Sequence, residues 1–473
     1  MEKKDYVVAI DLGTSKVATL VGRKSDENKI EILGSWMYDS LSGVVRGEIK
    51  NTEHVSNALQ QTIEGIEKDL RIHIREAWVG VSGQHIKTLK NSGYIFIENN
   101  DGEVLKRDVQ RLNDSMNNIQ IPIGETIVHI LPQEYRLDDE PDVREPIGMI
   151  GNKLDASFNI IVGDKSAIGR IDRTLSRYGI SVKRHILNPL AAAEAILHPD
   201  EKELGVCVVD IGGGTTDICI YHDNIIRHAA VIPLGGNIIN KDIRTYGILE
   251  RRVEALKVKF GGAVGAMERA DKFICVPGVN PRDPKEISCR NLAAIIEARL
   301  LDIIDSVILE IKKAGYEGRL DAGIVLTGGT AQTRNIDELF KTHTGYDVRV
   351  ALPDAYITSA SLELVNSPAY SVAVGLLLKA IGGATTTAEH RPPLMKTGGV
   401  TAVKQPVVKK EPVVPDAPPR RVWNHAPDND FPVDEEPQED TPPEENTKKK
   451  NGWLERIKKR FSDTFTVVED DEI

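Results

Sequence analysis

The chain uses one short pattern twice: an apolar strand that ends in aspartate, a turn of glycine, threonine and serine, and a second apolar strand. The first copy covers residues 6–20, around Asp11, and the second covers residues 206–221, around Asp210. The glycines at 212–214 permit a close approach that a side chain would block. Two such hairpins facing each other would present N–H groups and hydroxyls to phosphates, and carboxylates to a metal ion. We therefore expect a site for a nucleoside triphosphate and Mg²⁺.

The candidate phosphate ligands are the turn residues and the polar side chains beside them. The first hairpin supplies Asp11, Gly13, Thr14, Ser15 and Lys16, and the second supplies Asp210, Gly212, Gly213, Gly214, Thr215, Thr216 and Asp217. A third element, a strand over residues 324–327, leads into Gly328, Gly329 and Thr330, where adenine and ribose would lie against bare backbone. Asp11 and Asp210 are the expected Mg²⁺ ligands, through water. Each turn alone is also compatible with an ordinary glycine-rich loop, and only the three together predict the site.

Composition excludes several classes of function. The net charge of -11 gives no global basic field, so nucleic acid is not an expected partner. The four cysteines show no CxxC spacing, which favours a reducing cytosol and neither disulfides nor a metal cluster. The N-terminal residues lead directly into a strand without the pattern of a signal peptide. No apolar run has the length of a membrane span.

Alternating strands and helices over about the first 380 residues predict an α/β architecture. Helix patterns cover residues 53–70, 166–178, 190–197 and 291–314, and strand patterns cover residues 76–82, 158–162, 206–210 and 323–326. From about residue 82 to 158 the rhythm changes to a strand at 94–98, a helix at 106–117 and a strand at 126–135. We interpret this stretch as a small inserted module.

After about residue 382 the composition changes again. Residues 382–450 carry about half of the prolines and few large apolar side chains, which predicts a disordered tether. It is followed by an amphipathic pattern whose apolar stripe, projected on a helix, spans about 120°. The stripe contains Trp453, Leu454, Ile457, Phe461 and Phe465, and its edges carry Lys458 and Arg460. This pattern is typical of a helix in an anionic membrane interface. The alternative is a helix that packs on protein.

The three glycine-rich motifs, in this order, resemble the actin/Hsp70/sugar-kinase superfamily over roughly residues 5–380. Further segments are similar to the bacterial cell-division FtsA family: residues 231–237, 253–261, 131–135 and 146–154. The resemblance implies an actin-like two-domain ATPase fold with an inserted small α+β subdomain, a disordered proline-rich linker and a C-terminal amphipathic helix. Its cofactors would be ATP and Mg²⁺.

The implied organisation has four subdomains and a C-terminal extension. The boundaries are 1–82, 160–200 and 366–383 for subdomain 1A; 83–159 for subdomain 1C, called the inserted module below; 201–237 and 304–365 for subdomain 2A; 238–303 for subdomain 2B; 384–449 for the linker; 450–466 for the membrane helix; and 467–473 for an acidic tail.

The resemblance also adds site residues. Gly235 and Gly236 become nucleotide ligands, and Glu254 and Lys257 become adenosine contacts; the alternative for this last pair is a solvated ion pair on a helix. Asn188 stands where Hsp70-like relatives carry the glutamate that positions the attacking water. Since an amide does not accept the proton of water at neutral pH, we expect slow hydrolysis, with Asp210, Asn188 and Asp217 as the catalytic candidates.

The function that the resemblance implies is a cytoplasmic division protein, peripheral on the inner face of the membrane at the division site. It would polymerise there and tether the tubulin-like protein FtsZ during septum assembly. The FtsZ C-terminal tail would bind subdomain 2B, with Arg290 and Arg299 as candidate contacts, and other divisome proteins would bind subdomain 1C. The alternatives are a sugar or small-molecule kinase, for which we find no substrate-base motif, and an Hsp70-like ATPase, which needs a folded domain after residue 380.

Overall fold

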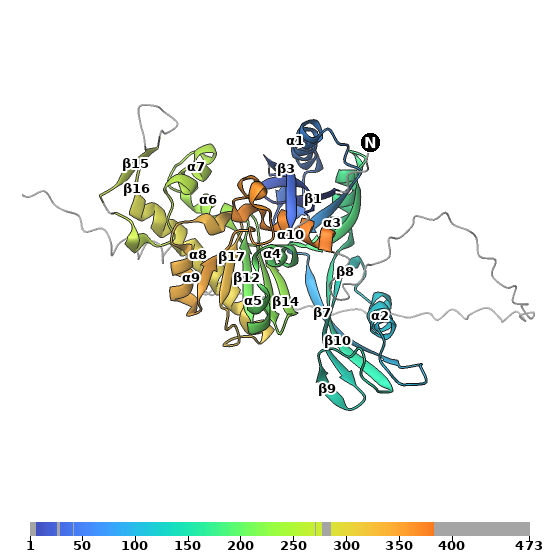
Figure 1. Ribbon diagram of the computed structural model, residues 1–473. Helices are drawn as coiled ribbons and strands as arrows, with labels where there is room; N and C mark the ends of the chain where they lie inside the picture. Colours follow the sequence, from blue (N-terminus) through green and yellow to red (C-terminus); the bar gives the residue numbers. More distant parts are fainter. Residues whose placement is uncertain (1–5, 26–28, 41, 270, 277–284, 383–473) are drawn as a thin grey trace, which may run out of the picture. The chain divides into compact units, whose positions relative to one another are not determined.

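The computed structural model describes residues 6–25, 29–40, 42–269, 271–276 and 285–382, which belong to one compact unit, Met1–Pro392 (Figure 1). The predicted linker, membrane helix and acidic tail lie outside the described residues. Within the described part, no helix combines the length and the hydropathy needed to cross a membrane.

The first sheet has five strands in the order β11-β6-β1-β2-β3. The first three strands along the chain form an antiparallel meander, and the last two run parallel to β1. Their bounds are β1 (Val7–Leu12), β2 (Lys16–Lys24), β3 (Ile30–Asp39), β6 (Glu76–Val81) and β11 (Ser181–Leu187). Two helices accompany the sheet, α1 (Thr52–Leu70) and α3 (Lys165–Ser176). Helix α1 begins at Asn51, whose side chain accepts two backbone N–H groups of the first turn.

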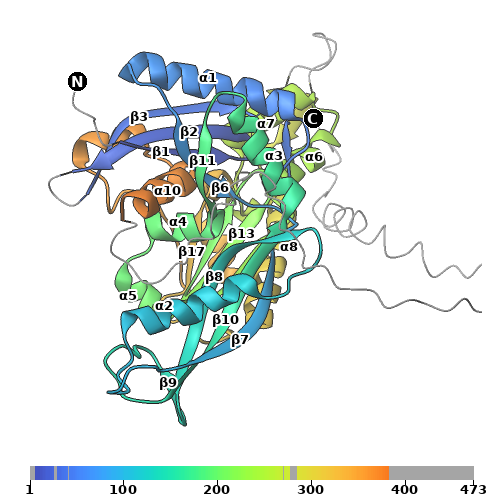
Figure 2. The ribbon, with the colours of Figure 1, turned by 90° about the vertical axis from the view of Figure 1, so that its right-hand side faces the viewer.

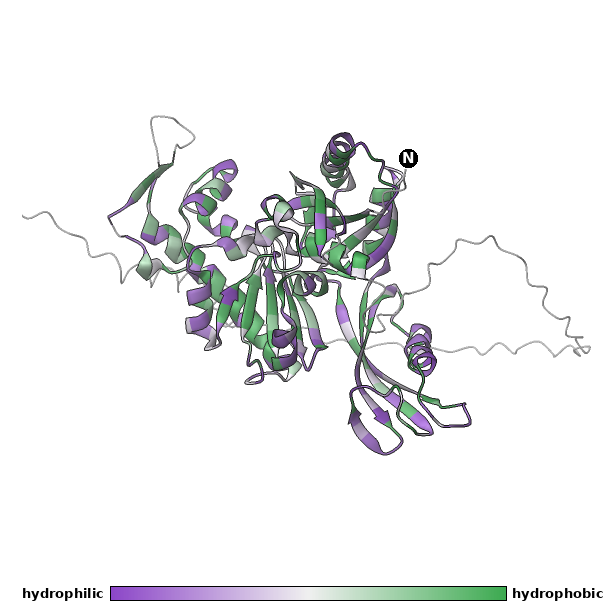
Figure 3. Ribbon diagram, in the orientation of Figure 1, coloured by the Kyte–Doolittle hydropathy of each residue, from purple (hydrophilic) through white to green (hydrophobic). Residues whose placement is uncertain are grey.

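The second sheet repeats this plan, with the order β14-β13-β12-β17-β18. Its first three strands again form a meander and its last two again run parallel to the central strand. The bounds are β12 (Val206–Ile211), β13 (Thr216–His222), β14 (Ile225–Ile232), β17 (Ile324–Thr327) and β18 (Val348–Val350), accompanied by α8 (Cys289–Ala314) and α9 (Ile336–Thr344). The central strands of both sheets are buried apolar runs (Figure 3). The repeated sequence pattern therefore corresponds to a repeated sheet.

Two helices connect the halves, α4 (Asn188–Ile196) and α10 (Ser371–Gly382). Helix α4 follows the last strand of the first sheet and reaches β12 and β13 of the second sheet. Helix α10 follows the second sheet and packs on β1, β2 and β6 of the first. The two helices also pack closely on each other, because a Cβ at Gly375 would overlap the backbone carbonyl of Ala191.

The inserted module forms its own antiparallel sheet, in the order β7-β10-β8-β9, between β6 and α3. The bounds are β7 (Lys87–Phe96), β8 (Glu125–Leu137), β9 (Glu140–Val143) and β10 (Lys153–Asp164), with helix α2 (Lys106–Ser115) and the short 3-10 helix η1 (Met116–Asn118). Figure 2 shows α2 lying across these strands. A separate apolar cluster, including Leu112, Phe158 and Ile160, fills the space between them. The predicted strand at 94–98 begins earlier than expected, at Lys87, because its first half is an exposed strand without an apolar pattern.

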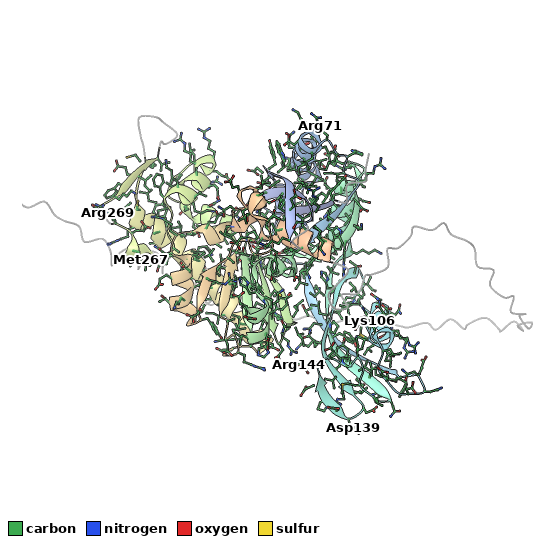
Figure 4. The ribbon with its side chains drawn as sticks, in the orientation of Figure 1. Arg71, Lys106, Asp139, Arg144, Met267 and Arg269 are labelled. Atoms are coloured by element: carbon green, nitrogen blue, oxygen red, sulfur yellow. The ribbon has the colours of Figure 1, made fainter. Side chains whose placement is uncertain are left out.

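The inserted module docks on β14, the edge strand of the second sheet. Thr88 donates to the carbonyl of Ala229, Gln133 to that of Ile226 and Asn159 to that of Arg227. Two ion pairs add to these bonds, Arg227–Glu134 at 3.0 Å and Arg144–Asp223 at 2.7 Å; Figure 4 labels Arg144. The module thus covers an edge that would otherwise present unpaired carbonyls.

The other elements are short or belong to the segment between β14 and α8. They are β4 (Val44–Val45), β5 (Glu48–Ile49), α5 (Pro199–Leu204), α6 (Gly236–Arg244), α7 (Glu250–Phe260), the 3-10 helix η2 (Gly265–Met267), β15 (Phe273–Val276), β16 (Lys285–Ser288), and three 3-10 helices, η3 (Gly329–Gln332), η4 (Ser359–Leu364) and η5 (Pro368–Tyr370).

Candidate functional site

A cavity of about 310 Å³ lies between the two Asp-containing hairpins. Ligand pockets of this kind begin at roughly this size. The structure brings most of the predicted ligands to its wall: Asp11, Gly13, Thr14, Ser15, Lys16, Asn188, Asp210, Gly212, Gly213, Gly214, Thr215, Asp217, Gly236, Glu254, Lys257, Gly328, Gly329 and Thr330.

The two hairpin turns face each other at close range. A Cβ at Gly213 would overlap Oγ of Ser15, and a Cβ at Gly214 would overlap Oγ1 of Thr14. The hydroxyl of Ser15 also lies 3.5 Å from Oδ1 of Asn237, at the start of α6. Glycine in the second turn is therefore required for the approach that places both sets of backbone N–H groups and hydroxyls on one cavity.

Three aspartate carboxyl groups lie in this wall, those of Asp11, Asp210 and Asp217, and all three residues are nearly inaccessible to solvent. Burial raises the pKa of Asp11, an effect that Lys16 partly offsets. Burial, with the nearby Asp11 carboxylate, raises the pKa of Asp210 to about 7. The Oδ1 atom of Asp11 is buried and has no hydrogen-bond partner in the described part of the chain. Clustered carboxylates with an unused oxygen suit a hard divalent cation such as Mg²⁺, which prefers oxygen ligands.

Lys16 supplies the positive charge of the cavity. Burial lowers the pKa of its ammonium group, while Asp11 and Asp210 act in the opposite direction. The ammonium group donates to the carbonyl of Ala369, which precedes α10, and lies 5.7 Å from the ring centroid of Tyr370. Lys16 therefore joins the first hairpin to the segment before α10 and remains on the cavity wall, where it suits a phosphate.

Asn188 and Asp217 also line the cavity. We call this part of the wall its inner end, because Asp217 is only 3% exposed. The Oδ1 atom of Asn188 is buried beside Gly80 of β6 and has no hydrogen-bond partner in the part that the structure describes. The carboxyl of Asp217 accepts the hydroxyl of Ser82 at 2.8 Å, and burial raises its pKa well above the usual range. Glu194 points elsewhere, toward Lys202 at 3.2 Å, and does not line the cavity.

The outer wall carries the pair on α7. Nζ of Lys257 lies 2.8 Å from Glu254 and donates to the carbonyl of Gly236 over 3.3 Å. The Lys257 side chain is only 9% exposed, whereas that of Glu254 is 59% exposed. The pair is thus an ion pair that also faces the cavity, where its carboxylate suits a ribose hydroxyl.

Two predicted ligands do not line the cavity. Thr216 is fully buried and donates to the carbonyl of Leu234, because strand alternation turns its side chain away from the turn. Gly235 packs against the backbone of Gly212 and Gly213. Both residues pack behind the wall, so the structure does not place either of them directly on the cavity.

Sequence reasoning missed several residues of the wall. They are Asn237, Val258, Gly261, Gln332, Thr333, Arg334, Pro368, Ala369 and Val372. Asn237 directly follows the Gly-Gly pair at 235–236, so the motif itself was a signal. The segment at 368–372 has no phosphate-binding signature and reaches the site only through the fold.

The two arginines predicted to meet a partner differ in their surroundings. The guanidinium group of Arg299 donates to both carboxylate oxygens of Asp242, at 2.8 and 3.2 Å, and to Asp302. An acidic peptide would compete with these bonds. Arg290, the second residue of α8, is half-buried, and its Nε has no hydrogen-bond partner among the described residues.

The repeated sheets, the crossing helices and the cavity between two glycine-rich hairpins define the actin-like ATPase fold. A chain of the PilM-PilN type IV pilus biogenesis complex shares the fold, with a TM-score of 0.55 at 14% identity over 79% of this chain and 98% of that chain.

Comparisons of sequence assign the family. The model of "Cell division protein FtsA" matches residues 207–375, and that of the "SHS2 domain inserted in FTSA" matches residues 83–162. FtsA of Pseudomonas aeruginosa is 36% identical over 79% of this chain and 88% of its own length. FtsA of Neisseria meningitidis is 37% identical over 80% and 90%, and that of Escherichia coli K12 is 33% identical over 79% and 90%. The chain belongs to the FtsA family of cell-division proteins.

The raised pKa of Asp210 predicts a pH-dependent stability. The unfolded-state pKa of aspartate is about 3.9, so between about pH 4 and 7 the folded chain holds a proton that the unfolded chain has lost. Stability therefore falls as the pH rises from about 4 to about 7 and is constant above that. Asp210→Asn removes this pH-dependent loss of folding free energy. At about 1.36 kcal/mol per pKa unit, a pKa difference of about three units makes the loss at most about 4 kcal/mol. We expect the melting temperature of the nucleotide-free variant, relative to wild type, to be higher at pH 8 than at pH 5. A difference that is the same at both pH values contradicts the prediction.

Proposed function

We propose that this protein binds ATP with Mg²⁺, polymerises at the inner face of the cytoplasmic membrane and tethers FtsZ there during septum assembly. The observation that carries the ATP site is the pair of facing hairpins, whose glycines, hydroxyls and Lys16 converge on one cavity with three buried carboxyl groups. Adenosine lies toward Glu254 and Lys257 in this proposal, and the phosphates lie toward residues 13–16 and 212–215. The family assignment supports the role in division.

In this proposal Asp11 and Asp210 would hold Mg²⁺ through water, and the ion would neutralise phosphate charge. Hydrolysis is slow in this proposal because Asn188 orients water without accepting its proton. Asp217 is engaged by the hydroxyl of Ser82. The bound nucleotide then acts chiefly on conformation and assembly.

The tether to FtsZ is tested by reconstitution on vesicles. The full chain, with ATP and Mg²⁺, is mixed with anionic liposomes and a labelled peptide of the acidic FtsZ C-terminal tail. We expect the peptide to sediment with the liposomes only when the chain is present. A chain without residues 451–473 is expected to bind the peptide in solution, and neither the chain nor the peptide is then expected to sediment with the liposomes. A peptide that the full chain does not bind at all rules out the tethering role.

The contact with the acidic tail is assigned to subdomain 2B, residues 238–303, with Arg290 as the better placed of the two candidate arginines. Arg290→Glu replaces an attractive charge with a repulsive one, and charged hydrogen bonds contribute about 1.5–3 kcal/mol. We expect the peptide affinity to fall by roughly 10- to 100-fold. Arg173→Glu, an equal change of charge on exposed α3 of the other half, is the control and is expected to have little effect. Equal losses in both variants point to net charge alone and contradict the assignment.

The remaining parts of the proposal concern the organisation of the chain. The inserted module, as subdomain 1C, serves contacts with other divisome proteins, because it has its own core and lines no part of the nucleotide cavity. Residues 384–449 act as a tether and residues 450–466 as the membrane anchor. The self-contacts of the filament supply many anchors at once, which strengthens weak individual binding.

A further inference from the structure

The inserted module meets the inner end of the nucleotide cavity at two points. Ser82, the residue directly before the module, donates through Oγ to Oδ1 of Asp217 over 2.8 Å. His129, in β8 of the module, accepts at Nε2 the backbone N–H of Leu187 over 3.0 Å. Leu187 directly precedes Asn188, the first residue of α4. Asp217 and Asn188, at the inner end of the cavity, are therefore each positioned by a residue that lies in the inserted module or directly before it.

Both contacts are buried. Ser82 is 7% exposed, His129 and Asp217 are each 3% exposed, and Leu187 is fully buried. In such surroundings a lost partner is not replaced by water, so the remaining donor or acceptor shifts to find another. Asp217 also has a side-chain hydrogen bond with Thr215. The direction of its carboxyl thus depends on Ser82 and Thr215 together, and the position of the start of α4 depends on His129.

The first contact also crosses between the halves of the molecule. Ser82 follows β6 of the first sheet, whereas Asp217 lies in β13 of the second sheet. The module itself bonds to carbonyls of β14, the neighbour of β13. A displacement of the module therefore changes both contacts and the edge of the second sheet together.

We propose that Ser82 and His129 are positioning residues, which hold Asp217 and Asn188 against the terminal phosphate of ATP and thereby couple the inserted module to the bound nucleotide. This inference rests on the proposed ATP site. ADP lacks the terminal phosphate, so the two residues contribute to the preference for the triphosphate and not to the binding of ADP. By reciprocity, a partner that fixes the module in its docked position favours the triphosphate, and the triphosphate favours the docked module.

The test measures, by calorimetry on the full chain with Mg²⁺, the affinities for ADP and for the non-hydrolysable triphosphate AMPPNP. A typical hydrogen bond contributes about 1 kcal/mol, so Ser82→Ala is expected to lower the AMPPNP affinity about fivefold and to leave the ADP affinity unchanged. Ser82→Thr keeps the hydroxyl and is expected to keep the preference. His129→Leu is expected to act like Ser82→Ala, and His129→Gln, which retains an acceptor near the position of Nε2, to restore the preference.

The control is Ser361→Ala, which removes a hydroxyl that is equally buried and bonded to the backbone of Ile32, away from the cavity wall. The inference is overturned if Ser82→Ala lowers the AMPPNP and ADP affinities by the same factor. It is also overturned if Ser82→Ala changes the two affinities no differently from Ser361→Ala. If His129→Leu does not fold, the Ser82 pair decides alone. Gly329→Val distinguishes a failure of the proposed ATP site from a failure of the coupling. If ADP binding is unchanged in Gly329→Val, the proposed ATP site is wrong. If Gly329→Val loses ADP binding but Ser82→Ala keeps the wild-type preference for AMPPNP, only the coupling is wrong.

Discussion

Gly329→Val is expected to weaken ATP binding by up to about two orders of magnitude while leaving the protein folded. Gly329 is exposed at the cavity wall, and a Cβ built on it meets no protein atom within 4 Å. Valine therefore projects into the space that adenine or ribose needs and clashes with the ligand alone. Overpacking of this kind costs roughly 1–3 kcal/mol, so we expect the ATP affinity, measured by calorimetry, to fall by about 5- to 150-fold.

The matched control is Gly169→Val. Gly169 lies in α3, and a Cβ there also meets nothing within 4 Å, but the residue is not part of the cavity wall. Gly213→Val is a less specific variant, because its side chain would strike Ser15 of the facing turn before reaching any ligand. Normal ATP affinity in a folded Gly329→Val protein would falsify the placement of the nucleotide.

Trp453→Glu is expected to release the chain from anionic liposomes without changing ATP affinity. Trp453 belongs to a predicted stripe of five large apolar side chains, and each contributes about 1.5–3 kcal/mol on full burial. The cost of ordering the helix reduces this gain, so a charge in the stripe removes most of what remains. Co-sedimentation with vesicles and a blue shift of tryptophan emission in the wild type are the measurements.

Ser462→Glu is the control for this variant. It adds the same charge, but Ser462 lies about 180° from Trp453 on the helical projection, outside the apolar arc. Lys458→Glu combined with Arg460→Glu is expected to weaken binding chiefly on anionic lipid and at low salt. If the tryptophan emission stays unchanged while the protein still sediments with vesicles, the helix is not the anchor and packs against protein.

The features that the sequence predicts well are local ones. Each Asp-containing hairpin consists of two apolar strands joined by a glycine-containing turn, so the pattern predicts both strands and the turn between them. The predicted helices at 53–70, 166–178, 190–197 and 291–314 all appear within two residues of their expected ends. Their caps and apolar periodicity are properties of a single segment.

The features that the sequence does not predict depend on contacts between distant segments. The segment at 368–372 reaches the cavity only because α10 returns to the first sheet. The first half of β7 has an exposed pattern, so no apolar run marks it as a strand. The bond between Ser82 and Asp217 joins residues 135 positions apart, and neither residue type reveals its partner.

Helix α10 follows the second sheet in the chain but packs on the first sheet, and this packing has a consequence for the synthesis of the protein. Helix α10 is translated last among the described elements, yet it packs on β1, β2 and β6, which are translated first. Until α10 arrives, the face of the first sheet that it covers has no native partner. We expect the nascent first half to need protection from aggregation, and the ATP cavity to form only after residue 382 has left the ribosome.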